Sequence, residues 1–459
     1  MPSTNSTIAA IATAPGVAAI GIVRLSGADA IATADRVFRS KLGRGLTESS
    51  TGRITRGVVV GTDLEPIDEC LVICRRAPNS YTGEDTAELH CHGSPTALAE
   101  ILRAVLANGA RQAEPGEFTK RAFLNGRLDL TQAEAVIDII EAETVAVAKN
   151  AAAQLGGAIA RRIDDGYGEL LDIAAHFHAT VDYPDEDIDD FKAGEYAFKL
   201  GQLENSLREL YDTFERGKVL KNGVAAAIIG KPNVGKSSLL NALVGFDRAI
   251  VTANPGTTRD TIEERAVFGG TLTRLIDTAG LRGTRDEAEA EGVERAIRAA
   301  RDAELVIAVF DGSANLTDED AAVLTNAKDA ANAVAVVTKS DLPPVLSDKS
   351  LGDGFSAVVR VSSKTGEGLS ALSDAIIAAL PEFPRGRTGE IITNARQAEA
   401  VDRAAEFVHA ASLALARGVT PDAALVEIES ALTAIGEITG RNIREDTIER
   451  IFERFCVGK

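Results

Sequence analysis

The chain has 459 residues, with 68 acidic side chains against 49 lysines and arginines and a formal net charge of −19. This length predicts roughly two to four domains, each able to bury a core. The acidic balance argues against a whole-surface attraction to nucleic acid, so any RNA would need a local basic patch or a basic partner. No apolar run reaches about 18 residues, so we expect no membrane span.

The first 120 residues predict an α+β domain with short strands and one helix. The apolar stretch Ile8 to Val23 is broken by Pro15-Gly16 and has no basic lead-in, which favours two strands over a signal peptide. The further expected elements are strands at Ala18–Leu25, Arg56–Val60, Cys70–Arg75 and Ala87–His92 and a helix at Leu98–Leu106. Two polar loops, 79–85 and 113–119, have the composition of ligand-binding loops.

The cysteines do not predict a disulfide framework. Cys70, Cys74, Cys91 and Cys456 are scattered, which fits a reducing cytoplasm. His90-Cys91-His92 resembles a metal motif, but alternation along a strand puts both histidines on one face and Cys91 on the other. Since no fourth ligand is evident, we favour a structural role here, and we expect Cys70 and Cys74 to be buried strand residues.

From Thr131 the apolar spacing becomes helical. Helices are expected up to Val181, over Tyr196–Arg216, and again over Ala395–Arg417, Asp422–Thr439 and Glu445–Phe455. They flank a self-contained α/β stretch, residues 222–381. We therefore predict one helical domain in two segments, 121–221 and 382–459, interrupted by an inserted domain.

The inserted stretch opens with a phosphate-binding signature. An apolar run, Val224 to Ile229, precedes Gly230, Gly235-Lys236-Ser237 and a helix from Ser238 to Val244, the pattern G-x-x-x-x-G-K-S. Its glycines let backbone N–H groups approach phosphate oxygens, and the helix N-terminus faces the same anion. Lys236 is expected to reach the β- and γ-phosphates and the Ser237 hydroxyl to bind Mg²⁺.

Two later segments complete a magnesium and γ-phosphate site. Thr258, in the loop Pro255–Asp260, is the expected second hydroxyl on Mg²⁺. A strand over Leu272–Ile276 ends in Asp277-Thr278-Ala279-Gly280, where Asp277 would hold Mg²⁺ through water and the Gly280 N–H would sense the γ-phosphate.

The remaining motifs predict guanine recognition. Strands at Leu305–Phe310, Ala333–Val337 and Ala357–Val361 lead to Thr338-Lys339-Ser340-Asp341 and Ser362-Ser363-Lys364. The Asp341 carboxylate would accept the N1–H and 2-amino protons that only guanine offers, with Lys339 along the base and the Ser363 N–H at O6. Thr338 stands where the usual GTPase sequence has Asn, so the side-chain amide that this Asn would offer to the base is lost. The other predicted nucleotide contacts are Asn233, Val234, Ser238, Thr252, Thr257, Thr278, Ala279, Ser362 and Lys364.

Two catalytic tasks are left open by these motifs. Leu281 replaces the water-orienting Gln of Ras-type GTPases, and no arginine finger is obvious. The carboxylates of the stretch 282–294 would orient water, or the stretch is a solvated switch segment; both readings remain open. They are Asp286, Glu287, Glu289, Glu291 and Glu294.

The whole sequence resembles the MnmE (TrmE) family of tRNA modification GTPases. The resemblance rests on residues 80–85, 115–119 and 121–135, on the P-G-T-T-R-D loop at 255–260 and on the F-C-V-G-K ending at 455–459. It implies that a K⁺ ion replaces the arginine finger when two GTPase domains face each other. Its implied ligands are Asn233, Thr252, Asn254 and Thr257, and Glu289 is implied to orient the attacking water.

The resemblance also implies an N-terminal domain that dimerises and binds a 5-formyl-tetrahydrofolate-type one-carbon donor. The matching positions are Arg24, Glu88, Arg127 and Lys459, with Arg127 standing where the family has Lys. Cys456 is either a nucleophile or a structural thiol.

Similar proteins act with the flavoprotein MnmG, as a heterotetramer, on C5 of the wobble uridine (position 34) of certain tRNAs. They install an aminomethyl or carboxymethylaminomethyl group there. The acidic charge suggests that the partner holds most of the tRNA. The alternative is a GTP-switched ribosome-assembly or RNA-binding factor, against which the single GTPase domain and acidic helical tail count.

Overall fold

The computed structural model describes residues 6–41, 43–182, 193–246, 263–277, 301, 303–380 and 389–458. The chain forms two compact units. The first comprises Met1–Ile137, Ala152–Leu207 and Ala400–Lys459, and the second comprises Asp138–Ala151 and Arg208–Glu399. The predicted α+β, helical and inserted α/β parts are all present, which confirms the fold class. The domain boundaries at 120, 221 and 381 stay predictions.

The N-terminal part is built on a seven-stranded sheet in the order β3-β4-β5-β6-β2-β1-β7. Its strands are β1 (Ile8–Ile11), β2 (Ala18–Ser26), β3 (Phe38–Ser40), β4 (Ile54–Val60), β5 (Pro66–Arg75), β6 (Thr86–Gly93) and β7 (Arg111–Gln112). The pairs are antiparallel except β1 with β7. The predicted strands are confirmed, whereas the short β3 and β7 were not predicted.

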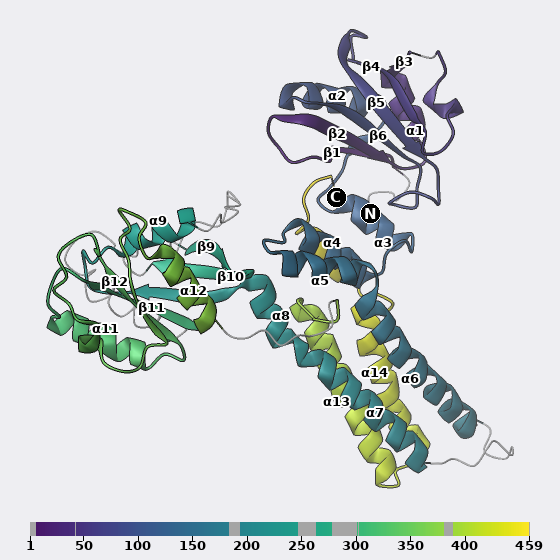
Figure 1. Cartoon of the computed structure of the whole chain (residues 1–459). Helices are drawn as coiled ribbons and strands as arrows, with labels where there is room; N and C mark the ends of the chain where they lie inside the picture. The colour runs from purple at the N-terminus through teal and green to yellow at the C-terminus, as the bar shows by residue number, and fades with distance from the viewer. Residues whose placement is uncertain are drawn as a thin grey trace. The chain divides into compact units, whose positions relative to one another are not determined.

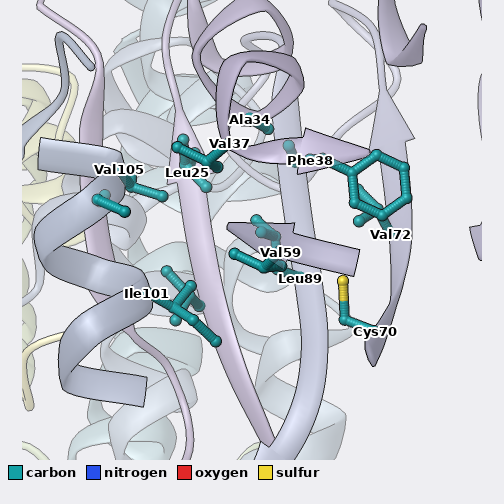
Figure 2. Close-up of a cluster of buried hydrophobic side chains, with 14 of the residues drawn as sticks. Leu25, Ala34, Val37, Phe38, Val59, Cys70, Val72, Leu89, Ile101 and Val105 are labelled. Carbon is teal, nitrogen blue, oxygen red and sulfur yellow. The ribbon is translucent and has the colours of Figure 1, made fainter. Parts of the chain in front are cut away.

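Helices α1 (Ala30–Val37) and α2 (Pro95–Ala107) cover one face of this sheet (Figure 1). Leu25 and Leu89 from the sheet pack with Ile101 and Val105 from α2 in a buried apolar core (Figure 2). The Ser94 side chain caps α2 by accepting the Ala97 N–H, and Pro95 occupies its first turn. Helix α1 was missed because it has only eight residues and no side-chain cap.

The opposite face of the sheet carries apolar side chains that remain exposed. Strand register sets Leu71 of β5 and Ile22 of β2 on either side of His90 of β6. Ile20 is 60% exposed, Ile54 58% and Leu71 44%. The sheet thus has one face buried by helices and one exposed face, on which these apolar side chains lie among polar ones such as His90.

The helical part contains the predicted helices with small shifts in their ends, and also α3, which was not predicted and which begins inside the polar loop expected over 113–119. They are α3 (Glu117–Leu124), α4 (Leu130–Ile140), α5 (Val145–Leu155), α6 (Ala158–Asp182), α7 (Ala193–Tyr211), α8 (Thr213–Asn222), α13 (Ala395–Ala416), α14 (Pro421–Thr439) and α15 (Glu445–Phe452). Helices α6 and α14 pack together, with His178 of α6 3.0 Å from Glu429 of α14, and Asp164 of α6 pairs at 2.8 Å with Arg441, which follows α14. The single helix expected over Tyr196–Arg216 is wrong, because Asp212 separates α7 from α8.

The inserted part has a six-stranded sheet in the order β13-β12-β11-β8-β10-β9. Its strands are β8 (Val224–Ile229), β9 (Glu263–Phe268), β10 (Thr271–Asp277), β11 (Leu305–Asp311), β12 (Ala333–Thr338) and β13 (Ala357–Arg360). All pairs are parallel except β9 with β10.

Helices cover both faces of this sheet, as the near-continuous burial of β8, β11 and β12 requires. Ala226 and Ile228 of β8 face α9 (Lys236–Phe246) and α12 (Leu369–Ala379). Ala227 and Ile229 belong to the core beside α11 (Asp318–Lys328). The short 3₁₀ helices are η1 (Leu46–Glu48) and η2 (Asp348–Leu351). Because β8 is central and buried on both faces, the loop that follows it sits on a rigid base.

Candidate functional site

The loop after β8 has the backbone geometry of a phosphate cradle. Gly230 has φ +158°, and a Cβ there would lie 2.6 Å from the Val309 carbonyl oxygen, so no larger residue fits. Asn233 and Gly235 have φ +62° and +97°. Asn is among the few residues that tolerate this left-handed region. These turns allow successive N–H groups to converge on one anion ahead of α9.

Lys236, the first residue of α9, is held inside this loop. Its side chain is buried, and its Nζ donates to the carbonyl oxygens of Gly230 at 2.6 Å and Lys231 at 2.8 Å. The ammonium therefore lies among the loop's own backbone groups, where its charge can reach phosphate oxygens.

Ser237 and Asp277, the residues predicted to hold Mg²⁺, lie together at the phosphate end of the site. β10 lies parallel to β8 with Asp277 opposite Ile228, which brings its carboxylate to the loop. The Ser237 hydroxyl donates to Asp277 Oδ2 at 2.9 Å. A hydroxyl beside a buried carboxylate is an all-oxygen donor set of the kind Mg²⁺ prefers. Thr258, the second predicted hydroxyl, lies outside the described residues, as do Thr278, Ala279 and Gly280.

The base end lies after β12 and β13. The Asp341 carboxylate is exposed, and its Oδ1 accepts a hydrogen bond from the buried Ser362 hydroxyl at 2.8 Å. The Ser340 N–H donates to the Val361 carbonyl at 3.2 Å, which ties the two loops together. The carboxylate is thus oriented by the neighbouring loop and still faces solvent, as a base reader must.

Lys339 is also fixed, by a residue that the sequence analysis did not single out. Its backbone has φ +58°, and its Nζ lies 2.6 Å from Asp311 Oδ2. Burial alone would raise the pKa of Asp311, but hydrogen bonds from Lys339 and Ser313 outweigh it and hold that pKa below its usual value. The lysine therefore has a charged partner that holds its stem in place beside the base loop.

Thr338 connects the base end to the phosphate loop. Its buried hydroxyl lies 2.6 Å from the Val234 carbonyl oxygen and 3.0 Å from that of Phe310, and its single proton is shared between these two acceptors. Threonine thus ties the end of β12 to the loop but offers no amide to a base. Replacing Asn by Thr at this position therefore removes a possible contact to the base but keeps the link to the phosphate loop.

In the N-terminal part, two of the predicted folate positions meet. Arg24 Nε donates to Glu88 Oε1 at 2.8 Å, and Arg24 Nη1 donates to the Gly458 carbonyl oxygen at 3.3 Å. The guanidinium also lies 5.8 Å from the Tyr81 ring centre and 5.7 Å from that of Phe118. Arg24, Glu88 and Tyr81 line a cavity of about 70 Å³ together with Ile73, Arg75, Thr82 and Thr86.

The third predicted position, Arg127, lies on the other side of the loop that carries Tyr81. An added Cβ at Gly83 would be 3.2 Å from the Arg127 side chain. Arg127 lines a larger cavity, of about 570 Å³, with Gln132 of α4 and Arg441 after α14. Lys459, the fourth position, lies outside the described residues.

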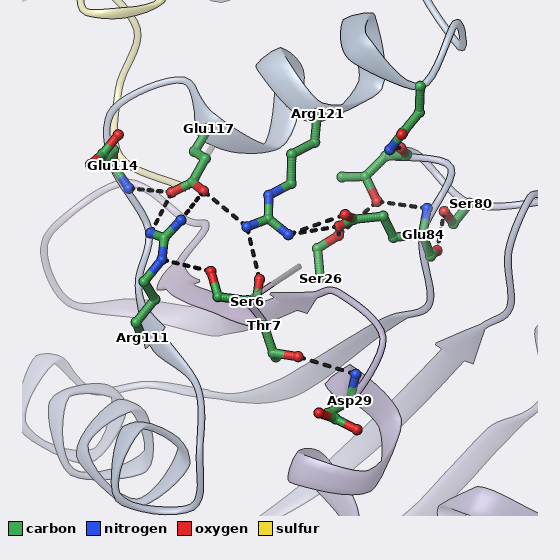
Figure 3. Close-up of polar contacts among 12 residues, drawn as sticks. Ser6, Thr7, Ser26, Asp29, Ser80, Glu84, Arg111, Glu114, Glu117 and Arg121 are labelled. Carbon is green, nitrogen blue, oxygen red and sulfur yellow. Dashed lines mark hydrogen bonds and ion pairs between the residues drawn. The ribbon is translucent and has the colours of Figure 1, made fainter. Parts of the chain in front are cut away.

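A buried charge network supports the loop at 80–85 (Figure 3). The Arg121 guanidinium donates to Glu84 Oε2 and to Glu117 Oε1, both at 3.0 Å, and to the Ser6 carbonyl at 2.8 Å. Burial alone would raise the pKa of Glu117, but hydrogen bonds from Arg111, the Glu114 N–H and Arg121 lower it overall. Glu84, Glu117 and Arg121 belong to motifs noted in the sequence, but Arg111 and Ser6 do not, and the network could not be predicted because its members are distant in sequence.

The cysteines and histidines of β5 and β6 follow the predicted alternation. Cys91 is buried opposite Cys70, and the Cys91 thiol together with burial raises the pKa of Cys70. His92 lies on the other face, exposed, with its Nδ1 2.8 Å from Asp68. Cys456 is exposed, and its carbonyl oxygen accepts the Gly116 N–H at 3.3 Å.

No described helix is long and apolar enough to cross a membrane.

The phosphate loop, the hydroxyl–carboxylate pair and the Asp341 carboxylate stand at the carboxyl ends of the parallel strands of one mixed sheet, and together they define a P-loop GTPase. Residues 130–456 match the family described as MnmE helical domain, and residues 7–127 match the family described as GTP-binding protein TrmE N-terminus. The chain belongs to the MnmE family of tRNA modification GTPases.

Relatives cover the chain from end to end. The tRNA modification GTPase MnmE of Symbiobacterium thermophilum is 43% identical over 99% of this chain and 100% of its own length. That of Chloroflexus aurantiacus is 44% identical over the same shares. Among solved structures, the G domain of the FeoB iron transporter of T. maritima is 30% identical over 34% of this chain and 98% of its own, with a TM-score of 0.27.

Proposed function

We propose that this chain hydrolyses GTP with K⁺ as activator and uses the cycle to modify the wobble uridine of certain tRNAs in the cytoplasm. The observation that carries the proposal is the nucleotide site itself. Lys236, Ser237 and Asp277 gather at the phosphate end, and Asp341 is aimed at the base end. Ser237 and, through water, Asp277 would hold Mg²⁺, which would supply positive charge beside the phosphates, while Lys236 and the loop N–H groups stabilise the charge on the transferred phosphoryl group.

Asn233 is the described residue that supports K⁺ activation. Asn233 is exposed within the phosphate loop. Its backbone has a left-handed conformation, with φ +62°. An amide oxygen is a suitable ligand for a hard monovalent cation beside phosphate. A cation there would add positive charge where an arginine finger does in other GTPases. The other proposed K⁺ ligands, Thr252, Asn254 and Thr257, and the water-orienting Glu289 lie outside the described residues.

The test compares GTP turnover in KCl and in NaCl at matched ionic strength, for the native chain and for Asn233→Ala. We expect strong stimulation by K⁺ in the native chain and its loss in the variant, with guanine nucleotide binding kept in both. Equal rates of the native chain in the two salts would remove K⁺ from the proposal. That result would instead favour activation by an arginine that a partner supplies.

A tetrahydrofolate-type donor is proposed for the cavity at Arg24 and Glu88. The pteridine ring of a folate offers N–H donors, which the Glu88 carboxylate can accept. The glutamyl tail of the folate is anionic and would pair with an arginine, for which Arg24 and Arg127 are the candidates. We expect Glu88→Gln to abolish binding of 5-formyl-tetrahydrofolate in calorimetry without changing the affinity for GDP. Unchanged folate binding by this variant would place the donor elsewhere, for example near Arg127.

A homodimer is proposed because the cavity and the apolar sheet face coincide. The side chains of Arg24, Ile73 and Glu88 belong to the exposed face of the N-terminal sheet. A cavity of about 70 Å³ is small beside ligand sites of roughly 300–1,000 Å³. A second chain laid on this face would bury its apolar side chains and add walls to the cavity.

The whole reaction is proposed to need a MnmG-type flavoprotein, which would hold most of the tRNA because this chain has a net charge of −19. The test is reconstitution with that flavoprotein, a tetrahydrofolate donor, GTP and tRNA, followed by nucleoside analysis of position 34. We expect an aminomethyl or carboxymethylaminomethyl group on C5. Normal GTP turnover with an unmodified uridine would instead favour a GTP-switched RNA-binding role.

A further inference from the structure

The connection from β11 to α11, residues 311–320, holds a carboxylate against the phosphate loop. Asp320, in the first turn of α11, has a side chain only 2% exposed, and its Oδ2 lies 2.6 Å from Lys231 Nζ. Lys231 directly follows Gly230 in the loop and is 16% exposed. The same Nζ donates to the Thr317 hydroxyl at 3.2 Å. The two charges are 89 residues apart in sequence, so no local motif predicts their contact.

Lys231 links this carboxylate to the residue that meets phosphate. Its side chain reaches outward to Asp320, whereas its carbonyl oxygen accepts the Lys236 ammonium at 2.8 Å. A shift of the Lys231 backbone would therefore move an acceptor of Lys236 and the turn at Gly230 together. The position of the cradle depends on where Lys231 is held.

Asp320 is a rigid anchor for that purpose. Its Oδ2 also accepts the Thr317 N–H and hydroxyl, both at 2.8 Å, as part of the capping box that begins α11. Its Oδ1 is buried and has no hydrogen-bond partner within the described ranges. A buried ion pair with an unsatisfied oxygen contributes little net stability, so its value lies in fixing a geometry.

We propose that Asp320 is a positioning residue for the phosphate loop and acts through Lys231. The pair holds the first turn of the loop so that its N–H groups converge before the nucleotide arrives. Pre-ordering a site reduces the entropy lost on binding, so the pair contributes to nucleotide affinity without touching the nucleotide. In the same connection Asp311 holds Lys339, so residues 311–320 support both ends of the site.

The test is a double-mutant cycle on the full chain, with the dissociation constant of a fluorescent GDP analogue and the melting temperature as readouts. We expect Lys231→Met and Asp320→Asn each to weaken GDP binding about tenfold, and the double variant to be no weaker than either single variant. Lys231→Arg keeps the charge and should restore affinity to within about twofold of the native chain. Independent effects would instead multiply, to about a hundredfold in the double variant.

Asp348→Asn is the matched control, because Asp348 pairs with Arg360 in the same domain at 2.6 Å without touching the loop. It should leave the affinity for GDP unchanged. The proposal is overturned if Lys231→Met and Asp320→Asn lower the melting temperature but keep native affinity, or if their effects on affinity multiply. Should Lys231→Met fail to fold, Asp320→Asn compared with Asp348→Asn decides by the same two readouts.

Discussion

We propose that a single carboxylate, that of Asp341, reads the base, and its surroundings explain how it is oriented. Ser362 donates one hydrogen bond to Asp341 Oδ1, so the carboxylate keeps acceptor capacity on both oxygens for the two donors of guanine. In Asp341→Asn the amide can donate to the 2-carbonyl of xanthine but clashes electrostatically with the 2-amino group of guanine. We therefore expect this variant to prefer XTP to GTP in turnover and binding assays.

The size of that change follows from the cost of leaving buried polar groups unpaired. We expect GTP binding by the variant to weaken by a factor on the order of 10³ or more. The matched control is the Asp348→Asn exchange described above, which should keep GTP preference. An Asp341→Asn protein that still prefers GTP would show that another residue reads the base.

Glu117 gives the N-terminal part a defined acid sensitivity. Its folded-state pKa lies below the ordinary value of 4.5 because Arg111 and Arg121 outweigh burial. Because its pKa is lower in the folded state, ionised Glu117 stabilises the fold at pH values above the unfolded-state pKa. This contribution to stability is lost as the pH falls through the folded-state pKa.

Comparing Glu117→Gln with the native chain isolates this effect. We expect the variant to have a lower free energy of unfolding at neutral pH, by roughly 1–3 kcal/mol. The difference should shrink steadily below about pH 4.5. Urea denaturation at several pH values measures it, and a difference independent of pH would contradict a charged Glu117 in the fold.

At the scale of elements, α8 closely approaches the segment that precedes α13. A Cβ added at Gly217 would lie 1.8 Å from the Ile392 carbonyl oxygen. Gly201, in α7, has nothing within 4 Å of its added Cβ. The two glycines therefore differ in packing but share a helical setting.

Alanine at these two positions should have opposite effects. Gly201→Ala is expected to stabilise by up to about 1 kcal/mol through helix propensity. Gly217→Ala gains the same propensity but must displace a backbone, so we expect a net loss of about 1–3 kcal/mol. Chemical denaturation checks both, and two changes of the same sign would refute the packing argument.

Local signals explain which elements could be predicted from the sequence. β8 and its loop were predicted because six buried apolar residues and a glycine-lysine pattern stand next to each other. The helix α1 and the break at Asp212 were not, because eight residues of mixed polarity and an ordinary aspartate carry no strong boundary signal.

The site was predictable to the same extent. Motifs predicted Lys236, Ser237, Asp277 and Asp341, each of which the fold brings to one sheet edge. The supports, Asp311 and Asp320, could not be found, because each acts across a distance in sequence that only the fold closes. The loops that carry Thr258 and Glu289 lie outside the described residues, so those roles stay predictions.

At the scale of the whole molecule, the open face of the N-terminal sheet predicts how chains associate. Leu71 of β5 is 44% exposed on this open face, opposite His90 of β6. We expect Leu71→Glu to turn a dimer into a monomer in light-scattering measurements, because it would bury a charge without a partner. Val426→Asp changes an exposed apolar residue of α14 instead and should leave the mass of the particle unchanged. A dimeric Leu71→Glu protein would exclude this face.

The contact between Arg24 and the Gly458 carbonyl joins positions 434 residues apart, close to the two ends of the chain. The bridge between Pro115 and Val457 sets the same ending against the N-terminal part. Within the described residues, the N-terminal sheet itself contains no strand from this ending. Removal of residues 457 and 458 would therefore leave the sheet's strands in place but take away the backbone acceptor of the Arg24 guanidinium, so the orientation of a side chain that lines the cavity depends on residues from the far end of the sequence.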